Sequence, residues 1–256
     1  MEYNSNKNLS VLIITLNEET QMASLLVDLN FADEVLVVDS FSSDNTKSIC
    51  ESFSNVKFIQ NKFENFTSQR NFAIEQAKND WILFLDADER LTPELKNEIL
   101  YTIENNKTHT AFLFYRRFMF KNTVLHFSGW QTDKIFRLFH KNFAKYTTER
   151  LVHEKLKVEG SVGILKNKLI HYSFSDFESY KAKMINYGKF KAQEKFKKNL
   201  KPSFWIKALH PAYNFLYNYV IRLGFIDGKK GVIICYLNAY SVYVRYLELE
   251  KLWKGK

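Results

Sequence analysis

The sequence predicts an α/β fold in which a mostly parallel central sheet is covered by helices on both faces. Short apolar, β-branched runs alternate with segments of helical spacing through the first hundred residues. The strand runs are apolar throughout, whereas a strand with one solvated face would be apolar at every second residue. Strands buried on both faces require helices above and below a parallel sheet.

The elements of this first part follow in order. Strands are expected at residues 10–15 (SVLIIT), 34–39 (EVLVVD), 56–60 and 81–85 (WILFL). Helices are expected at 18–29, 43–53 and 66–77, and another opens at Thr92 and Pro93 and runs to about Ile103. Proline fits the first helical position because its missing N–H has no helical partner there.

The pattern changes after residue 110. Strands are expected at 111–120 and 135–139, with loops at 130–134 and 141–150, and the chain reads as helical from Ser175 on.

With 46% hydrophobic residues the chain can bury a sizeable core, which excludes wholesale disorder. Cys50 and Cys235 have no metal-ligand spacing, so two reduced thiols are expected. Residues 1–10 are polar and lack the apolar core of a signal peptide, so a cytoplasmic location is expected.

The net charge of +9 is unevenly distributed. Between residues 181 and 201 a single acid, Glu194, faces eight lysines: Lys181, Lys183, Lys189, Lys191, Lys195, Lys197, Lys198 and Lys201. Such a face attracts phosphate in anionic lipid or nucleic acid, or it is simply a solvated helix surface. The apolar-aromatic segments 204–223 and 232–247 follow. The 14 uncharged residues of 231–244 fall short of the ~20 that cross a bilayer, so these segments pack on the domain or lie in the membrane interface.

Polar clusters follow three of the expected strands. They are Leu16-Asn17-Glu18, Asp39-Ser40 and Asp86-Ala87-Asp88. In open α/β sheets ligands bind beyond the carboxyl ends of the strands, so these clusters are expected to converge on one site. Asp86 and Asp88 repel each other, and a divalent cation such as Mg²⁺ or Mn²⁺ relieves that repulsion and can bridge to a diphosphate. The alternative is an acidic turn that caps the next helix. The sequence has neither a G-x-G-x-x-G motif nor a P-loop.

These segments carry a family resemblance. SVLIITLNEE, EVLVVDSFSSDNT and SQRNFAIEQAKNDWILFLDADERL resemble the nucleotide-binding half of family 2 inverting glycosyltransferases, which have the GT-A fold. GW, DKIFRLFHK, RLVHEKL, LIHYS, FIDGKKG and YVRYLEL are similar to the branch of lipopolysaccharide core β-glucosyltransferases. The resemblance implies a glycosyltransferase domain over residues 1–174, with a nucleotide-binding half (1–104) and an acceptor half (105–174), and a helical extension over 175–256.

The resemblance also implies roles for single residues. Thr15, Leu16 and Glu18 would line the base and ribose, and Asp39 would accept a hydrogen bond from the nucleobase, usually uracil. Arg70 would approach the base or diphosphate, where a planar guanidinium suits phosphate. In the Asp86-Ala87-Asp88 segment, Asp86 would lie by the ribose or behind the metal, and Asp88 would bind the metal. His153 is the candidate for a further metal ligand.

Inverting transfer needs a base for the proton of the acceptor hydroxyl. Glu154 is the first candidate and Asp133 the rival, which could instead hold a sugar. Trp130 is expected either to stack on a sugar of the acceptor or to pack in the protein. His126, His140, His171 and His210 are interpreted as structural or unassigned.

The predicted function is a metal-dependent transfer of one sugar, glucose from UDP-glucose, onto a lipid-linked oligosaccharide such as lipopolysaccharide core. The lysine run and the aromatic helices would hold the enzyme peripherally at the inner face of the cytoplasmic membrane. Alternative acceptors are a polyprenyl phosphate, a capsule precursor or a protein. A nucleic-acid-binding module ranks far lower because the strand-end acids repel phosphate backbones, so no nucleic acid partner is expected. A catalytically dead binding protein is the remaining alternative.

Overall fold

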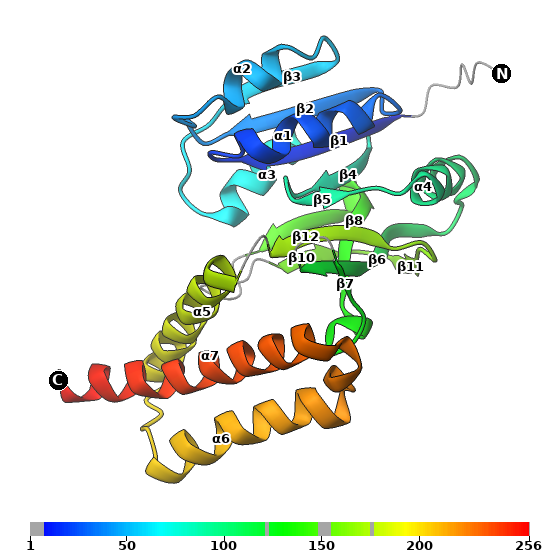
Figure 1. Ribbon diagram of the computed structural model, residues 1–256. Coiled ribbons are helices and arrows are strands. Elements are labelled where there is room, and N and C mark those ends of the chain that lie inside the picture. Colours follow the sequence, from blue (N-terminus) through cyan, green and yellow to red (C-terminus); the bar gives the residue numbers. More distant parts are fainter. Residues whose placement is uncertain (1–7, 121–122, 148–154, 175–176, 256) are drawn as a thin grey trace. The chain divides into compact units, whose positions relative to one another are not determined.

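The computed structural model describes residues 8–120, 123–147, 155–174 and 177–255. The chain divides into two compact units (Figure 1). The first runs to Arg116 and resumes over Lys134–His171, and the second comprises Arg117–Asp133 and everything from Tyr172 on. The segment Arg117–Asp133 therefore groups with the C-terminal helices, whereas the expected domain boundary at 174/175 places it in the first domain.

The first unit begins with the strand–helix alternation expected from the sequence. Its parallel strands are β1 (Leu9–Thr15), β2 (Glu34–Asp39), β3 (Val56–Gln60) and β4 (Trp81–Leu85). Its helices are α1 (Glu19–Leu26) with the 3-10 turn Val27–Leu29, α2 (Thr46–Glu51), α3 (Phe66–Gln76) and α4 (Pro93–Asn105). Helix α2 is shorter than the expected 43–53, because the Ser43 N–H donates to Asn17 in the loop after β1 and the Asn45 N–H donates to Glu19 at the start of α1.

Beyond β4 the sheet is mixed: β8 pairs antiparallel with both β4 and β6, whereas β11 pairs with β6 in parallel. Its order is β3-β2-β1-β4-β8-β6-β12-β5, with β7 and β11 also paired to β6. These later strands are β5 (Glu89–Arg90), β6 (His109–Phe120), β7 (Thr123–Leu125), β8 (Lys134–His140), β11 (Ser161–Ile164) and β12 (Leu169–Phe174). The mostly parallel arrangement thus holds for the first four strands, and the whole sheet is mixed. Strand β8 pairs with β4, and β12 pairs with β5, so both reach the segment that follows β4.

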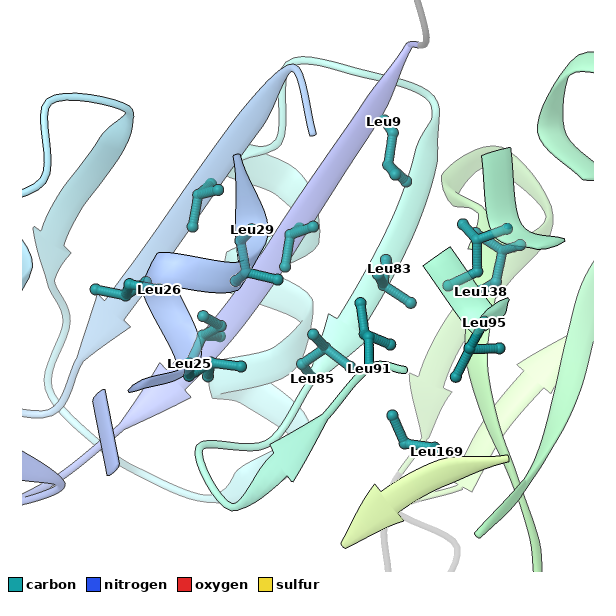
Figure 2. Close-up of a cluster of buried hydrophobic side chains, with 14 of the residues drawn as sticks. Leu9, Leu25, Leu26, Leu29, Leu83, Leu85, Leu91, Leu95, Leu138 and Leu169 are labelled. Carbon is teal, nitrogen blue, oxygen red and sulfur yellow. The ribbon is translucent and has the colours of Figure 1, made fainter. Parts of the chain in front are cut away.

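The fully apolar strands are explained by two hydrophobic cores, one on each face of the sheet. Alternate residues of β1 point to opposite faces: Val11 and Ile13 join one core, and Leu12 joins the other. Leucines from α1, β4 and α4 fill the first core together with Leu138 and Leu169 (Figure 2). Helix α3 and the antiparallel pair of β9 (Ala144–Thr147) and β10 (Lys155–Val158) cover the second.

Strand β9 corrects the expectation of a loop over residues 141–150. Lys141–Phe143 form a 3-10 turn, and Ala144–Thr147 form the strand. Its alternation is only four residues long, with Ala144 and Tyr146 buried, too short to stand out in the sequence. Tyr146 is fixed from outside the segment, because its N–H donates to the Asn71 side chain (3.0 Å) and its carbonyl accepts from it (2.9 Å).

The second unit is built on α5 (Phe177–Lys197), α6 (Phe204–Leu216) and α7 (Gly228–Lys254), with a π-helical turn (Tyr217–Ile221) and a 3-10 turn (Gly224–Asp227) between α6 and α7. Helix α7 packs against both α5 and α6 (Figure 1). A Cβ on Gly188 would lie 2.7 Å from the carbonyl oxygen of Ser241, so α5 and α7 approach closely there. Within the described ranges, no helix is both long and apolar enough to cross a bilayer.

Candidate nucleotide and metal site

The loops after β1 and β2 hold each other through side chains. The Asn17 N–H donates to Ser42 Oγ (2.8 Å), and the Ser43 N–H donates back to Asn17 Oδ1 (2.8 Å). The Glu18 N–H donates to Thr46 Oγ1 (2.9 Å). Asn17 has a positive φ of 56°, a conformation that asparagine tolerates better than most residues. The two strand ends therefore form one rim, on which Leu16 is exposed and Glu18 half-buried.

Asp39 and Thr15 lie side by side at the ends of β2 and β1. Asp39 is fully buried and accepts from the Ser42 N–H (2.9 Å) and from Gln60 Nε2 (3.0 Å). Thr15 is 5% exposed, and its Oγ1 is buried without a hydrogen-bond partner in the described part of the chain. A buried hydroxyl in that state indicates a group that a ligand or water completes.

Asp86 anchors a buried ionic network directly after β4. Its Oδ1 accepts from Arg70 Nη2 (2.8 Å), and its Oδ2 accepts from Arg137 Nη2. The same Arg137 nitrogen donates to Glu89 Oε1 (2.7 Å), and the Asp86 N–H donates to Glu89 Oε2 (3.0 Å). Arg70 also stacks on the Phe84 ring, 4.6 Å from its centroid. The carboxylate of Asp86 is thus fixed in place by two guanidinium groups.

The charges of this network shift its pKa values in opposite directions. Burial alone would raise the pKa of Asp86, but Arg137 and then Arg70 outweigh burial and hold it well below its usual value. Burial raises the pKa of Glu89, which Arg137 offsets only in part. Burial would lower the pKa of Arg137, but Asp86 and Glu89 raise it above its usual value. Asp86 and Arg137 therefore stay ionised.

Asp88 faces a histidine that the sequence left unassigned. His171 Nε2 lies 3.1 Å from Asp88 Oδ2, and His171 Nδ1 lies 3.3 Å from Nη1 of Arg116. The pairing of β12 with β5 places His171 opposite Glu89. About a third of the Asp88 side chain is exposed, so this carboxylate is accessible from outside.

Arg90 fixes the turn that carries Asp86 and Asp88 through hydrogen bonds to backbone carbonyls. Its Nη1 donates to the carbonyl of Ala87 (2.7 Å), and its Nη2 donates to the carbonyl of Gln21 in α1 (2.9 Å). Ala87 itself is buried in the first core. This arrangement ties the Asp86–Asp88 turn to the helix that follows β1. The pKa of Glu18 is raised by burial, then by the charges of Asp88 and Asp44, which indicates an excess of negative charge at this rim.

The structure brings together Thr15, Glu18, Asp39, Arg70, Asp86 and Asp88 in the first unit, as the strand-end prediction requires. Trp130 and Asp133 belong to the second unit. There Trp130 packs on Phe118 with 4.2 Å between ring centroids, and the Asp133 N–H closes a 3-10 turn on the Trp130 carbonyl (3.3 Å). His153 and Glu154 lie outside the described residues, so their roles stay predictions.

The sequence assigned no role to four side chains that contact the candidate site: Glu89, Arg116, Arg137 and His171. Arg137 offered a signal, since an arginine inside the apolar strand 135–139 must be paired if it is buried. His171 offered a weaker one, as a polar residue between Ile170 and Tyr172. Their partners could not be read from the sequence, because β8 and β12 reach the site through antiparallel pairings.

Known proteins resemble this chain over most of its length. An uncharacterized glycosyltransferase of Rickettsia bellii (strain RML369-C) is 31% identical over 257 residues, covering 96% of this chain and 87% of that protein. The lipopolysaccharide core biosynthesis glycosyltransferase LpsC of Rhizobium meliloti (strain 1021) is 26% identical over 255 residues, covering 93% of each.

A solved structure extends the comparison to the fold. The mannosyltransferase PcManGT from Pyrobaculum calidifontis, solved in complex with GDP-Man and Mn²⁺, matches with a TM-score of 0.57 at 14% identity, covering 97% of this chain and 88% of that one. At this identity the likeness concerns the fold alone. The family model for glycosyl transferase family 2 matches residues 10–158, more than half of the sequence. The chain therefore belongs to glycosyl transferase family 2, and it is a glycosyltransferase with the α/β GT-A fold.

Proposed function

We propose that the chain is an inverting, metal-dependent glycosyltransferase that moves a sugar, glucose from UDP-glucose, onto a lipid-linked oligosaccharide such as lipopolysaccharide core. The observation that carries the proposal is the pair of Asp88 and His171, which lies beside the Asp86 network at the ends of β1, β2 and β4. The likeness to LpsC supports the class of acceptor. A polyprenyl phosphate, a capsule precursor and a protein are the alternative acceptors.

The donor nucleotide would bind along the rim of the first two strand ends. Thr15 Oγ1 would complete its hydrogen bonding on the base or ribose, next to Leu16 and Glu18. Asp39 would accept from the base through an oxygen lone pair that Ser42 and Gln60 leave available. Arg70 would approach the diphosphate while it holds Asp86.

Asp88 and His171 are the residues that would hold a divalent cation. One carboxylate oxygen and one imidazole nitrogen 3.1 Å apart form a donor pair that suits Mn²⁺ or Mg²⁺, more readily Mn²⁺ because of the nitrogen. The excess negative charge that raises the pKa of Glu18 also favours a cation here. Among the residues that the structure describes, no three His, Cys, Asp or Glu side chains form a complete cage, so donor phosphates and water would supply the other ligands. Asp86 is bound by two arginines, so it would lie behind the metal and not bind it directly. His153 remains a candidate for a further metal ligand.

The cation, when bound, neutralises charge on the departing nucleotide diphosphate. The other requirement of a single displacement is a base, and we assign it to Glu154, with Asp133 as the rival. That carboxylate would take the proton of the acceptor hydroxyl as its oxygen attacks the anomeric carbon. Trp130 would contact the acceptor. The lysine run and C-terminal aromatic helices would hold the enzyme at the inner face of the cytoplasmic membrane.

A thermal-shift screen against UDP-, GDP-, ADP- and CMP-sugars tests the donor. A ligand at about 100 times its Kd adds about 2.7 kcal/mol to the free energy of unfolding. UDP-glucose with Mn²⁺ is the proposed donor, so it is expected to raise the melting temperature most. Thr15→Val should reduce this shift, since it removes only the unpartnered hydroxyl. A larger shift with a GDP-sugar would refute the choice of nucleotide, and no shift with any of them would refute the proposed function.

His171→Ala tests the metal ligands. It is expected to weaken Mn²⁺ binding at least about tenfold, as measured by electron paramagnetic resonance of free Mn²⁺ in a titration without substrate. His109→Ala is the matched control, because His109 also lies in the first unit but bonds to Ser161 Oγ (3.0 Å). Equal Mn²⁺ affinity in the two variants would remove His171 from the site.

A further inference from the structure

Basic side chains of the second unit, together with the imidazole of His210 in α6, gather around Tyr246 of α7. The Lys195 ammonium of α5 lies 5.7 Å from the centroid of the Tyr246 ring, and His210 Nδ1 of α6 lies 2.8 Å from the Tyr246 hydroxyl. Arg245 is half-buried next to Tyr246, and Lys198 follows the end of α5. We refer to Lys195, Lys198 and Arg245 as the cationic cluster.

The cationic cluster has more positive charge than its surroundings compensate. Burial lowers the pKa of Lys195, and the charges of Arg245 and Lys198 lower it further. The pKa of His210 is lowered by burial, then by Arg245 and Lys195. Arg245 Nε is buried without a hydrogen-bond partner in the described part of the chain.

The acids near this cluster are shared with other lysines and do not balance its charge. The charge of Glu194 acts on Arg245, but Glu194 also binds Lys191 (2.8 Å), and Glu250 binds both Lys207 and Lys254 (2.8 Å each). The wider segment 177–254 contains 15 lysines and arginines against five acids. The cationic cluster is therefore a place where an external anion would be stabilised.

An exposed apolar face of α6 adjoins the cationic cluster. Trp205, Leu209 and Tyr213 follow one another at a spacing of four residues and are 69%, 62% and 63% exposed. With Ile206 and His210 they line a shallow groove of about 320 Å³. His210 thus borders the groove on one side and contacts Tyr246, at the centre of the cationic cluster, on the other.

We propose that the cationic cluster binds the phosphate headgroup of an anionic membrane lipid while the exposed face of α6 lies among the acyl chains. This inference deepens the proposed membrane contact and rests on it. An anionic lipid offers phosphate and hydrocarbon together, which matches the neighbouring cationic and apolar surfaces. A free phosphate would leave the apolar face uncovered. A second copy of the chain would bring an identical cationic cluster, so like charges would repel at that interface.

Sedimentation with vesicles tests the cationic cluster. The full chain is expected to bind vesicles of phosphatidylcholine with phosphatidylglycerol, and to bind phosphatidylcholine alone much more weakly. Lys195→Gln with Lys198→Gln should weaken binding to the anionic vesicles by about tenfold or more. Lys189→Gln with Lys197→Gln is the matched control, because it removes the same charge from exposed positions of α5 and should cost much less. Equal losses in the two double variants would overturn the headgroup site.

A second pair of substitutions tests the apolar face. Trp205→Ser with Leu209→Ser should abolish vesicle binding without unfolding the chain, because both side chains are largely exposed. Unchanged vesicle binding, or a dimer at micromolar concentration that the same substitutions dissociate, would overturn the lipid assignment. Binding of soluble glycerol phosphate as strong as that of the vesicles would also overturn it. The thermal-shift screen with sugar nucleotides contains no lipid. If no sugar nucleotide shifts the melting temperature, that result counts against the proposed function and not against the headgroup site.

Discussion

Asp88→Asn is expected to lower the rate of sugar transfer about a hundredfold or more, with little change in the fold. The amide keeps the size of the side chain but loses the negative charge that would hold the cation, and about 3 kcal/mol of transition-state stabilisation corresponds to that factor. Asp88 is partly exposed and pairs with His171, while Asp86 is held by its own bonds to Arg70 and Arg137, so the Asp86 network should survive the substitution. Initial rates with the best donor over a range of Mn²⁺ concentrations measure the effect.

Asp80→Asn is the matched control for this prediction. Asp80 lies directly before β4, and its exposed carboxylate forms a surface ion pair with Lys141 (3.5 Å). We expect near-normal rates from it, because exposed ion pairs contribute at most about 1 kcal/mol. Turnover by Asp88→Asn equal to that of the control, at every Mn²⁺ concentration, would rule out Asp88 as the metal ligand.

The strand ends of the first unit could be predicted because their signals are local. Each of β1, β2 and β4 is a continuous apolar run that stops at a polar residue, and parallel pairing brings such ends to one edge of the sheet. Thr15 and Asp39 are register partners for this reason. The same local signal places Asp86 and Asp88 at the end of β4, and their roles there stay predictions.

The partners of those aspartates could not be predicted, because they depend on long-range antiparallel pairing. His171 is 83 residues from Asp88, and Arg137 is 51 residues from Asp86. The polar residue inside LIHYS is only a weak local signal, and it does not indicate which residue His171 contacts. The short strand β9 was missed for a similar reason, since its place is set by hydrogen bonds from Asn71 in α3.

Arg137→Met is expected to be the most destabilising single substitution in the first unit, at about 3–5 kcal/mol. The Arg137 side chain is 1% exposed, and its loss leaves the fully buried Glu89 without its cation. Asp86 would keep its ion pair with Arg70, so most of the lost free energy of unfolding would come from the unpaired carboxylate of Glu89. For a chain of this size the melting temperature should fall by about 6–20 °C, which circular dichroism measures. Lys141→Met, which removes a partly exposed lysine, should cost no more than about 1 kcal/mol.

The double variant Glu89→Gln with Arg137→Met separates lost charge pairing from lost packing. The introduced glutamine would bring no charge into the core, so most of the lost stability should return if the uncompensated carboxylate is the cause. The single variant gives a second test through pH. Without Arg137, burial holds the pKa of Glu89 still further above its unfolded value, so the folded state gains a proton as the pH falls. The stability deficit of Arg137→Met should therefore be smaller at about pH 5 than at about pH 8. A deficit that is independent of pH and unrelieved by the second substitution would mean that Arg137 stabilises the fold by packing alone.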